Sequence, residues 1–321
     1  MSDTTGLAAA VRGGDRTALA RAITLVESTR TDHRSDAEAL LAELFDATGQ
    51  SIRVGVSGAP GTGKSTLIEA LGLHAVERDH RVAVLAVDPS STRTGGSILG
   101  DKTRMSELGR SDRAFIRPSP TGGTLGGVAR RTREAMLCCE AAGYDVVLVE
   151  TVGVGQSEVT VSDMVDMFTV VLAPGAGDEL QGIKRGIVEL ADLLVVNKAD
   201  GDLEAAAHRA AADYAAALAF VRVRSDAWTP RVLECSALER KGIDELWDAI
   251  GTFRDALTRS GGFDARRADQ ARAWMWSELT DTMLERLRSD PEVARRLEQA
   301  EAAVADGGLL PPVAAREVLD S

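Results

Sequence analysis

The pattern of apolar and polar positions changes twice along the chain. Apolar residues recur at helical spacing within residues 7–45, which predicts two or three amphipathic helices with Asp15 and Asp32 as caps. From Ser51, short runs rich in β-branched residues alternate with helical stretches, and after Phe253 only helical spacing remains. We therefore expect three parts: a helical extension at 1–48, an α/β domain at 49–255 and a C-terminal helical arm at 256–321.

Seven short apolar runs in the middle of the chain are predicted strands. Strands that are buried on both faces and alternate with helices form a mostly parallel α/β sheet. Ligands bind beyond the carboxyl ends of the strands in such sheets, so the residues that follow each strand are candidates for chemistry. The predicted strands are 52–57, 82–87, 114–117, 146–150, 168–173, 193–197 and 232–235, and the predicted helices include 65–78, 128–142, 179–190 and 203–218.

The C-terminal arm carries an apolar stripe that includes tryptophan. Residues 264–287 and 291–304 are predicted helices, and residues 307–312 end the second one. A stripe of this kind usually belongs to a core, but little chain remains after it to build one. A packed core and a contact between two copies of the chain are both open alternatives. The stripe consists of Trp274, Met275, Leu279, Met283 and Leu287.

The residues that follow the first predicted strand form a phosphate-binding loop. They match the pattern G-x-x-x-x-G-K-[ST] in the strand–loop–helix setting that this motif requires. Glycines let backbone N–H groups turn inward around phosphate oxygens, and the following helix presents its positive end to the same anion. We expect Lys64 to reach the β- and γ-phosphates and the Ser65 hydroxyl to ligate Mg²⁺. The predicted nucleotide-binding residues are Gly58, Ala59, Pro60, Gly61, Thr62, Gly63, Lys64, Ser65 and Thr66.

Two further motifs predict a site for guanine. The N-K-x-D pattern ends in Asp200, whose carboxylate can accept from the N1–H and the exocyclic amino group of guanine, whereas adenine lacks both donors there. A site built for these bonds rejects the wrong base because its polar groups are left unpaired. A backbone N–H of the later Ser-Ala-Leu loop is expected to contact the guanine oxygen. The predicted base-binding residues are Asn197, Lys198, Asp200, Ser236, Ala237 and Leu238, and the order of the motifs predicts a GTPase.

Acidic residues that follow two other strands are candidate magnesium ligands. Asp88 follows the second predicted strand, so its carboxylate is expected to face the phosphates. Glu150 begins the sequence Glu-Thr-Val-Gly, which is similar to the D-x-x-G switch of GTPases with Glu in place of Asp. We expect Glu150 to hold Mg²⁺ through water and the Gly153 amide to sense the γ-phosphate.

Glycine-rich segments follow the strands and are predicted mobile loops. Residues 92–104 are rich in glycine, hydroxyls and basic side chains, which is typical of a loop that orders on nucleotide, although an ordinary surface loop has a similar composition. Within it, Asp101 is a candidate metal or water-positioning group. In segment 174–184, Lys184 is placed to supply positive charge to the active site. Segment 121–127 opens another helix and has no assigned role.

The charge balance argues against nucleic acid and membrane partners. The 321 residues include 37 Lys and Arg against 49 Asp and Glu, a formal net charge of -12, so the surface repels phosphate backbones and anionic lipids. We see no secretory signal and no apolar run long enough to span a bilayer, so we expect a cytoplasmic protein. Cys138, Cys139 and Cys235 lack metal-ligand spacing and are expected to be reduced packing residues.

The stretches SGAPGTGKST, VDPSSTRTGGSILGDKTRM, VETVGVGQSE, PGAGDELQGIK and NKAD, in this order, closely resemble one family. It is the G-protein chaperone of adenosylcobalamin-dependent methylmalonyl-CoA mutase, whose bacterial members were earlier labelled arginine/ornithine transport ATPases or kinases. The resemblance covers roughly residues 9–276 and implies a slow GTPase of the dimer-forming P-loop class. It further implies a protein that binds the mutase, gates the loading of its cobalamin cofactor and protects it from inactivation.

The resemblance also implies roles for individual residues. By position, Asp88, Asp101 and Glu150 match the metal and active-site acids of the family. Gln181 and Lys184 match its partner-responsive third switch, and the C-terminal helical arm matches the element through which its members form homodimers.

Other functions fit the sequence less well. A transport-linked ATPase or kinase, as the old label suggests, conflicts with the N-K-x-D motif and with the absence of a membrane-binding segment. A metal-insertion GTPase usually carries Cys/His metal-handling motifs, and a signalling GTPase often carries a lipidation site. Neither feature occurs in this sequence.

Overall fold

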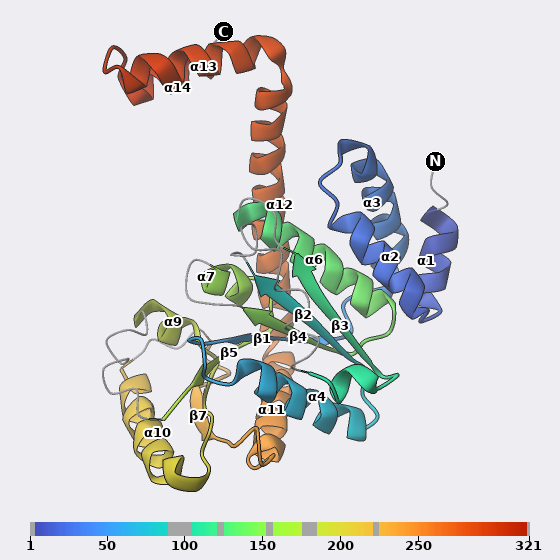
Figure 1. Cartoon of the computed structure of the whole chain (residues 1–321), viewed down its shortest axis with the longest axis vertical. Helices are drawn as coiled ribbons and strands as arrows, with labels where there is room; N and C mark the ends of the chain where they lie inside the picture. Colours follow the sequence, from blue (N-terminus) through green and yellow to red (C-terminus); the bar gives the residue numbers. More distant parts are fainter. Residues whose placement is uncertain are drawn as a thin grey trace. The chain divides into compact units, whose positions relative to one another are not determined.

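A seven-stranded parallel sheet forms the centre of the fold (Figure 1). Its strand order is β3-β2-β4-β1-β5-β6-β7, and each pairing is parallel, so the predicted α/β class is confirmed. The predicted strands are all present, with ends that differ by a few residues. Their bounds are β1 (Ile52–Ser57), β2 (Val82–Asp88), β3 (Ala114–Pro120), β4 (Val146–Thr151), β5 (Met167–Leu172), β6 (Leu193–Val196) and β7 (Arg231–Glu234).

The computed structural model describes residues 4–88, 105–120, 125–151, 157–174, 185–220 and 225–319. The chain divides into two compact units, Met1–Ala268 and Asp269–Ser321. One helix, α12 (Gly262–Ser289), begins in the first unit and ends in the second.

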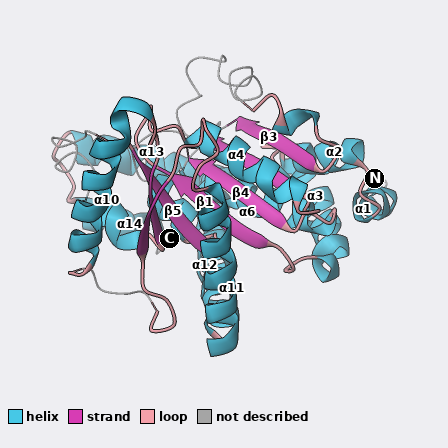
Figure 2. Cartoon of the chain, turned by 90° about the horizontal axis from the view of Figure 1, so that it is seen from below, coloured by secondary structure: helices cyan, strands magenta, loops and turns pink. Residues whose placement is uncertain are grey.

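Helices cover both faces of the sheet (Figure 2). Successive strand residues point to opposite faces, so Val82 and Val84 join one hydrophobic cluster while Ala83 and Leu85 join the other. The face of Val82 is covered by α4 (Lys64–Glu77), η3 (Leu108–Arg110) and α11 (Ile243–Ser260). The other face is covered by α6 (Leu125–Ala141), α7 (Ser157–Ser162), α9 (Arg185–Leu190) and α10 (Glu204–Leu218).

Three N-terminal helices pack against α6 and complete one of these clusters. Asp15 caps the second of them as predicted, since its carboxylate accepts from Thr17 N at 2.7 Å. The predicted cap at Asp32 is wrong: the third helix begins at Thr31, so Asp32 lies inside its first turn and accepts from Arg30 instead. The helices are α1 (Thr4–Arg12), α2 (Arg16–Val26) and α3 (Thr31–Leu44), followed by the short η1 (Phe45–Ala47).

The second unit consists of helices. The remainder of α12 is followed by α13 (Pro291–Ala305) and by α14 (Pro311–Leu319), which packs on α13. The helix α14 is not predicted from the sequence. On α12, the apolar side chains Met275, Trp276, Leu279 and Met283 are exposed to solvent within the chain. Among the described helices, none has the length and hydropathy needed to cross a bilayer.

Buried charges at the amino ends of the strands are paired with arginine. Asp166 and Asp192 precede β5 and β6, and their carboxylates accept from Arg267 at 2.7 Å and from Arg266 at 3.0 Å. Asp166 also accepts from the Arg53 backbone N–H at 2.8 Å. These pairs fix the first turns of α12 to the edge of the sheet that lies opposite the carboxyl ends of the strands.

A third buried pair joins β1 to α6. The Glu140 carboxylate accepts from Arg53 Nε at 2.7 Å and from the Gly49 N–H at 2.8 Å, and also from the Ser51 hydroxyl. Burial by itself raises the pKa of Glu140, but the hydrogen bonds and charge of Arg53 outweigh it, and the pKa lies below its ordinary value. The charged form of Glu140 therefore stabilises the fold.

Replacing Glu140 by Gln should lower the free energy of unfolding by about 3 kcal/mol at neutral pH, because Arg53 keeps its buried charge without a counter-ion. Since the pKa is depressed in the fold, this contribution is complete above pH 4.5, the ordinary value, and declines as the pH falls below it. Urea unfolding at pH 7 and at acid pH measures both effects. The matched control is Glu38→Gln, which removes the more exposed Arg34–Glu38 pair. An equal loss in both variants contradicts the prediction.

Candidate functional site

A glycine loop connects β1 to α4, and its backbone has a conformation that residues with a side chain rarely adopt. Gly58, Gly61 and Gly63 have φ values of 147°, 83° and 89°. A Cβ at Gly58 would lie 2.2 Å from the Val171 carbonyl oxygen, and a Cβ at Gly63 would lie 2.5 Å from Asn197 Nδ2. The loop therefore requires glycine both for its conformation and for its close approach to β5 and the end of β6.

Lys64 is the first residue of α4 and bends back over this loop. Its Nζ donates to the carbonyl oxygens of Gly58 at 2.8 Å and Ala59 at 3.1 Å, and the residue is 8% exposed. The ammonium group thus lies against the loop at the amino end of a helix, where anions bind favourably. The predicted contact of Lys64 with the β- and γ-phosphates stays a prediction.

Ser65 and Glu150 are brought together from distant parts of the sequence. The Ser65 hydroxyl donates to Glu150 Oε1 at 2.8 Å, and Glu150 is 3% exposed. Parallel pairing places Glu150 opposite Val56 near the carboxyl end of β1. The next residue of β4, Thr151, donates to the Ser57 hydroxyl oxygen at 2.9 Å, which ties the ends of the two strands.

The donor atoms at this point fit magnesium. Mg²⁺ prefers hard oxygen ligands and usually keeps several waters, with one or two carboxylates and substrate phosphates completing its shell. A hydroxyl and a carboxylate oxygen meet beside the glycine loop, which is the chemistry such a shell needs. The backbone of Asp88 ends β2, two residues beyond Ala86, the partner of Glu150 in β4. Within the described ranges, no cluster of three His, Cys, Asp or Glu side chains could hold a metal without added ligands.

Asn197 links the glycine loop to the second predicted loop of the base site. Its Nδ2 donates to the Thr62 carbonyl oxygen at 3.0 Å, and its Oδ1 accepts from the Ala237 N–H at 3.0 Å. Asn197 is 2% exposed. The sequence predicts a nucleotide-binding role for this residue, whereas the structure shows its amide bonded to protein on both sides.

Asp200 and Ser236 lie side by side at the far end of the same region. The Ser236 hydroxyl donates to Asp200 Oδ2 and accepts from the Glu239 N–H. The intervening backbone is held by a hydrogen bond from the Ala199 N–H to the Cys235 carbonyl oxygen at 2.9 Å. Lys198 has a left-handed backbone with φ of 62°, and Leu238 is 80% exposed. The two predicted base loops therefore form one surface with a carboxylate and an open apolar side chain.

Arg240 is a residue that the motifs do not identify. It follows the Ser-Ala-Leu loop with a left-handed φ of 57°, and its guanidinium lies 3.1 Å from Glu107 and 3.5 Å from Glu77. Glu107 in turn donates its N–H to Glu69 of α4 at 2.9 Å. The base loop, the glycine-loop helix and the segment before η3 are thus connected. No local pattern could have predicted a link across 133 residues.

Several predicted site residues lie outside the described residues. They are Asp101, Gly153, Gln181 and Lys184, and the side chain of Asp88 belongs with them. Their proposed roles therefore stay predictions.

The sequence of this chain matches the model of one protein family. The model of the family described as "Methylmalonyl Co-A mutase-associated GTPase MeaB" matches residues 19–292. The chain belongs to this family. The match includes the glycine loop, both base loops and the segments that carry the predicted acids.

Similar proteins in other organisms support membership of the MeaB family. A probable GTPase of Mycobacterium tuberculosis is 56% identical over 315 residues, covering 98% of this chain and 94% of that protein. The mouse protein named methylmalonic aciduria type A homolog, mitochondrial, is 50% identical and covers 94% of this chain and 75% of its own length. The Escherichia coli GTPase ArgK is 49% identical over 96% of this chain and 93% of its own.

A solved structure has the same fold as this MeaB-family chain. The crystal structure of a LAO/AO transport system kinase is 41% identical with a TM-score of 0.79, and the match covers 100% of this chain and 97% of that one.

Asn197→Asp should lower both the stability of the fold and the affinity for nucleotide, because the new side chain has the same shape but cannot make the same hydrogen bonds. The substitution replaces a donor nitrogen by an oxygen that faces the carbonyls of Thr62 and Gly63 and adds a buried charge. We expect the free energy of unfolding to fall by about 2 kcal/mol. Urea unfolding and titration with a fluorescent guanine nucleotide measure the loss of stability and affinity.

Gln50→Glu makes the same chemical change at an exposed residue and is the matched control. Wild-type stability and wild-type nucleotide affinity in the Asn197→Asp protein would show that the link through Asn197 does not organise the site.

Proposed function

We propose that this chain hydrolyses GTP to GDP and phosphate with Mg²⁺. The observation that carries the proposal is the hydrogen-bonded connection, through Asn197, between the glycine loop and the loops of Asp200 and Ser236. A phosphate-binding loop alone is compatible with any nucleotide. A carboxylate held at a fixed distance from it selects guanine.

The chain's own residues supply most of the proposed mechanism. Lys64 Nζ donates to the carbonyl oxygens of Gly58 and Ala59, which places its ammonium group beside the glycine loop. On nucleotide binding its ammonium moves to the β- and γ-phosphate oxygens and stabilises the charge that develops there. Ser65 and Glu150 would hold Mg²⁺, Glu150 through water, with Asp88 and Asp101 as further acids, and the metal would supply positive charge against the phosphates. The Gly153 amide would sense the γ-phosphate.

Base selection rests on Asp200. Its carboxylate accepts from the guanine N1–H and exocyclic amino group, and Ser236 keeps it oriented through the hydroxyl hydrogen bond. The aliphatic part of Lys198 and the exposed Leu238 are available to cover the ring.

We further propose that hydrolysis serves a partner, an adenosylcobalamin-dependent methylmalonyl-CoA mutase in the cytoplasm. The mutase-associated GTPase family to which the chain belongs and the name of the mouse relative support this partner. The chain would gate loading of the cobalamin cofactor and protect the mutase from inactivation, with Gln181 and Lys184 responding to the partner. Exposed Met275, Trp276 and Leu279 on α12 support a homodimer through the C-terminal arm, because large apolar side chains are enriched in such contacts.

Asp200→Asn should weaken GTP binding by roughly tenfold to a hundredfold, because an amide cannot accept from both guanine donors. The same amide can donate to the second carbonyl of xanthine, so xanthosine triphosphate should bind the variant better than it binds the wild type. Hydrolysis and binding of GTP, ATP and xanthosine triphosphate are measured for both proteins, with Lys64→Ala as the inactive reference.

Asp202→Asn changes an exposed carboxylate two residues away and is the matched control. Unchanged selectivity in Asp200→Asn refutes the base assignment. A wild-type preference for ATP favours the alternative of a transport-linked ATPase or kinase.

Lys184→Ala should separate intrinsic from stimulated hydrolysis. If Lys184 acts only when the mutase is bound, the intrinsic rate is retained and the rate with added methylmalonyl-CoA mutase falls. Lys241→Ala removes an exposed lysine and serves as the control. Equal loss of both rates would refute the partner-responsive role, and GTP turnover that ignores the mutase in the wild type would refute the proposed partner.

A further inference from the structure

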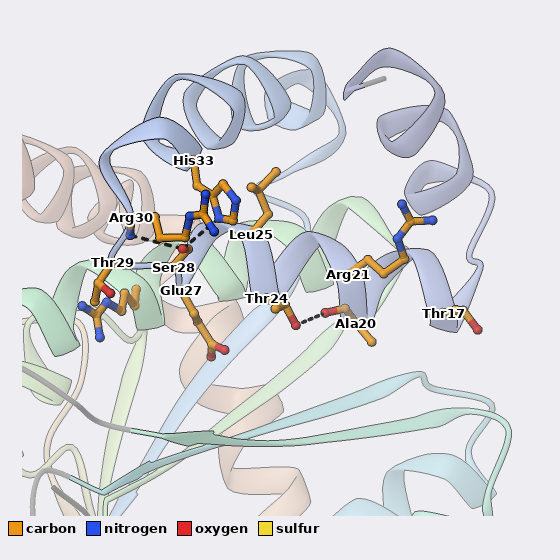
Figure 3. Close-up of a pocket in the computed structure, with 11 residues that line it drawn as sticks. Thr17, Ala20, Arg21, Thr24, Leu25, Glu27, Ser28, Thr29, Arg30 and His33 are labelled. Atoms are coloured by element: carbon orange, nitrogen blue, oxygen red, sulfur yellow. Dashed lines mark hydrogen bonds between the residues drawn. The ribbon is translucent and has the colours of Figure 1, made fainter. Parts of the chain in front are cut away.

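A groove runs along α2, away from the candidate nucleotide site. Two open depressions of about 820 and 680 Å³ both contact Thr17 and Ala20 of α2, and we call the two together the groove. The first lies between α2, the loop before α3 and Arg131 of α6, and the second continues beside η3 and β3. In Figure 3, Thr17, Thr24 and Glu27 point from α2 toward the neighbouring strands.

The groove is basic although the chain is acidic. Its lining contains five arginines and one carboxylate, while the chain has a formal net charge of -12. The carboxylate, Glu27, already accepts from Arg117 at 2.5 Å, so it offers little repulsion to an anion. The five arginines are Arg16, Arg21, Arg30, Arg110 and Arg131.

Two of these arginines have their charge available. Arg21 and Arg110 make no side-chain hydrogen bond or ion pair with the described part of the chain. Arg16 and Arg30 are paired only with exposed acids, Asp112 at 3.6 Å and Asp32. Exposed pairs of this kind are worth less than about 1 kcal/mol and exchange readily for a better anion.

Apolar side chains lie between the charges. Ala20 and Leu25 of α2 line the first cavity, and Phe115 and Ile116 of β3 line the second. A small inorganic anion gains nothing from contact with apolar side chains. A peptide with alternating acidic and apolar side chains can contact both the guanidinium groups and the apolar floor of the groove.

We propose that this groove docks a short acidic and apolar segment of a partner protein. The 11 residues of α2 extend for about 16 Å, the length of roughly five residues of extended peptide. A nucleic acid would run beyond such a short basic surface onto the acidic remainder of the molecule, where its phosphates are repelled. No lining residue belongs to the candidate nucleotide site, so the proposal is independent of the proposed function.

Fluorescence anisotropy with a labelled hexapeptide of alternating glutamate and leucine tests the proposal on the full-length protein. The peptide should bind, and its affinity should fall as salt is raised. Arg21→Ser combined with Arg110→Ser should weaken binding by about tenfold, since two charge contacts are lost. The matched control combines Arg209→Ser and Arg259→Ser, which remove two exposed arginines from α10 and α11.

A second variant blocks the groove without changing its charge. Thr17 lines both cavities, and the native cysteines Cys138, Cys139 and Cys235 are buried, so Thr17→Cys provides one reactive thiol. The unlabelled protein should bind the peptide, and attachment of a bulky maleimide should abolish binding.

Three results overturn the proposal. One is absence of binding to the wild type, and another is equal weakening by the groove pair, Arg21→Ser with Arg110→Ser, and by the control pair. The third is equal binding of hexaglutamate, which would make the groove a site for small or general polyanions. A hexapeptide of alternating lysine and leucine should not bind, and GTP hydrolysis, measured in the same samples, should be unchanged in every variant.

Discussion

The candidate site depends on the two hydrogen bonds that the Asn197 side chain makes with the loops on either side of it. It follows β6, while the glycine loop follows β1, and β5 lies between these strands. By donating to Thr62 and accepting from Ala237, the amide crosses over β5 and joins both loops. An amide bonded at its nitrogen and oxygen cannot rotate without breaking both contacts. The distance between the glycine loop and the loop of Ser236 and Ala237 is therefore fixed by contacts within the protein.

The two edges of the sheet hold different charged contacts. At the amino ends of the strands, Glu140, Asp166 and Asp192 are each neutralised by an arginine within the fold. At the carboxyl ends, Lys64 Nζ donates to the carbonyl oxygens of Gly58 and Ala59, and the Ser65 hydroxyl donates to the Glu150 carboxylate. The arginine pairs at the amino ends are charge-assisted hydrogen bonds between oppositely charged groups, which are stronger than hydrogen bonds between neutral groups.

Local patterns in the sequence predict the parallel sheet, the glycine loop and the base loops, because each depends on residues that are neighbours in the chain. Contacts between distant residues are not encoded in that way: the bond from Asn197 to Thr62 spans 135 residues. The sequence also suggested a cap at Asp32, but the helix begins one residue earlier. Helix α14 begins at Pro311, inside the segment 307–312 whose glycines and prolines predict a break, because proline is well tolerated in the first turn of a helix.

The first turns of α12 determine where the chain can be shortened without loss of stability. A protein ending after Ala268, where the first compact unit ends, retains Arg266 and Arg267 and with them the counter-ions of Asp192 and Asp166. A protein ending at residue 255, where strand signals have stopped, would leave both carboxylates buried beside the sheet without those guanidinium groups. The smallest stable GTPase unit is thus defined by two arginines in a helix that belongs, by sequence, to the arm.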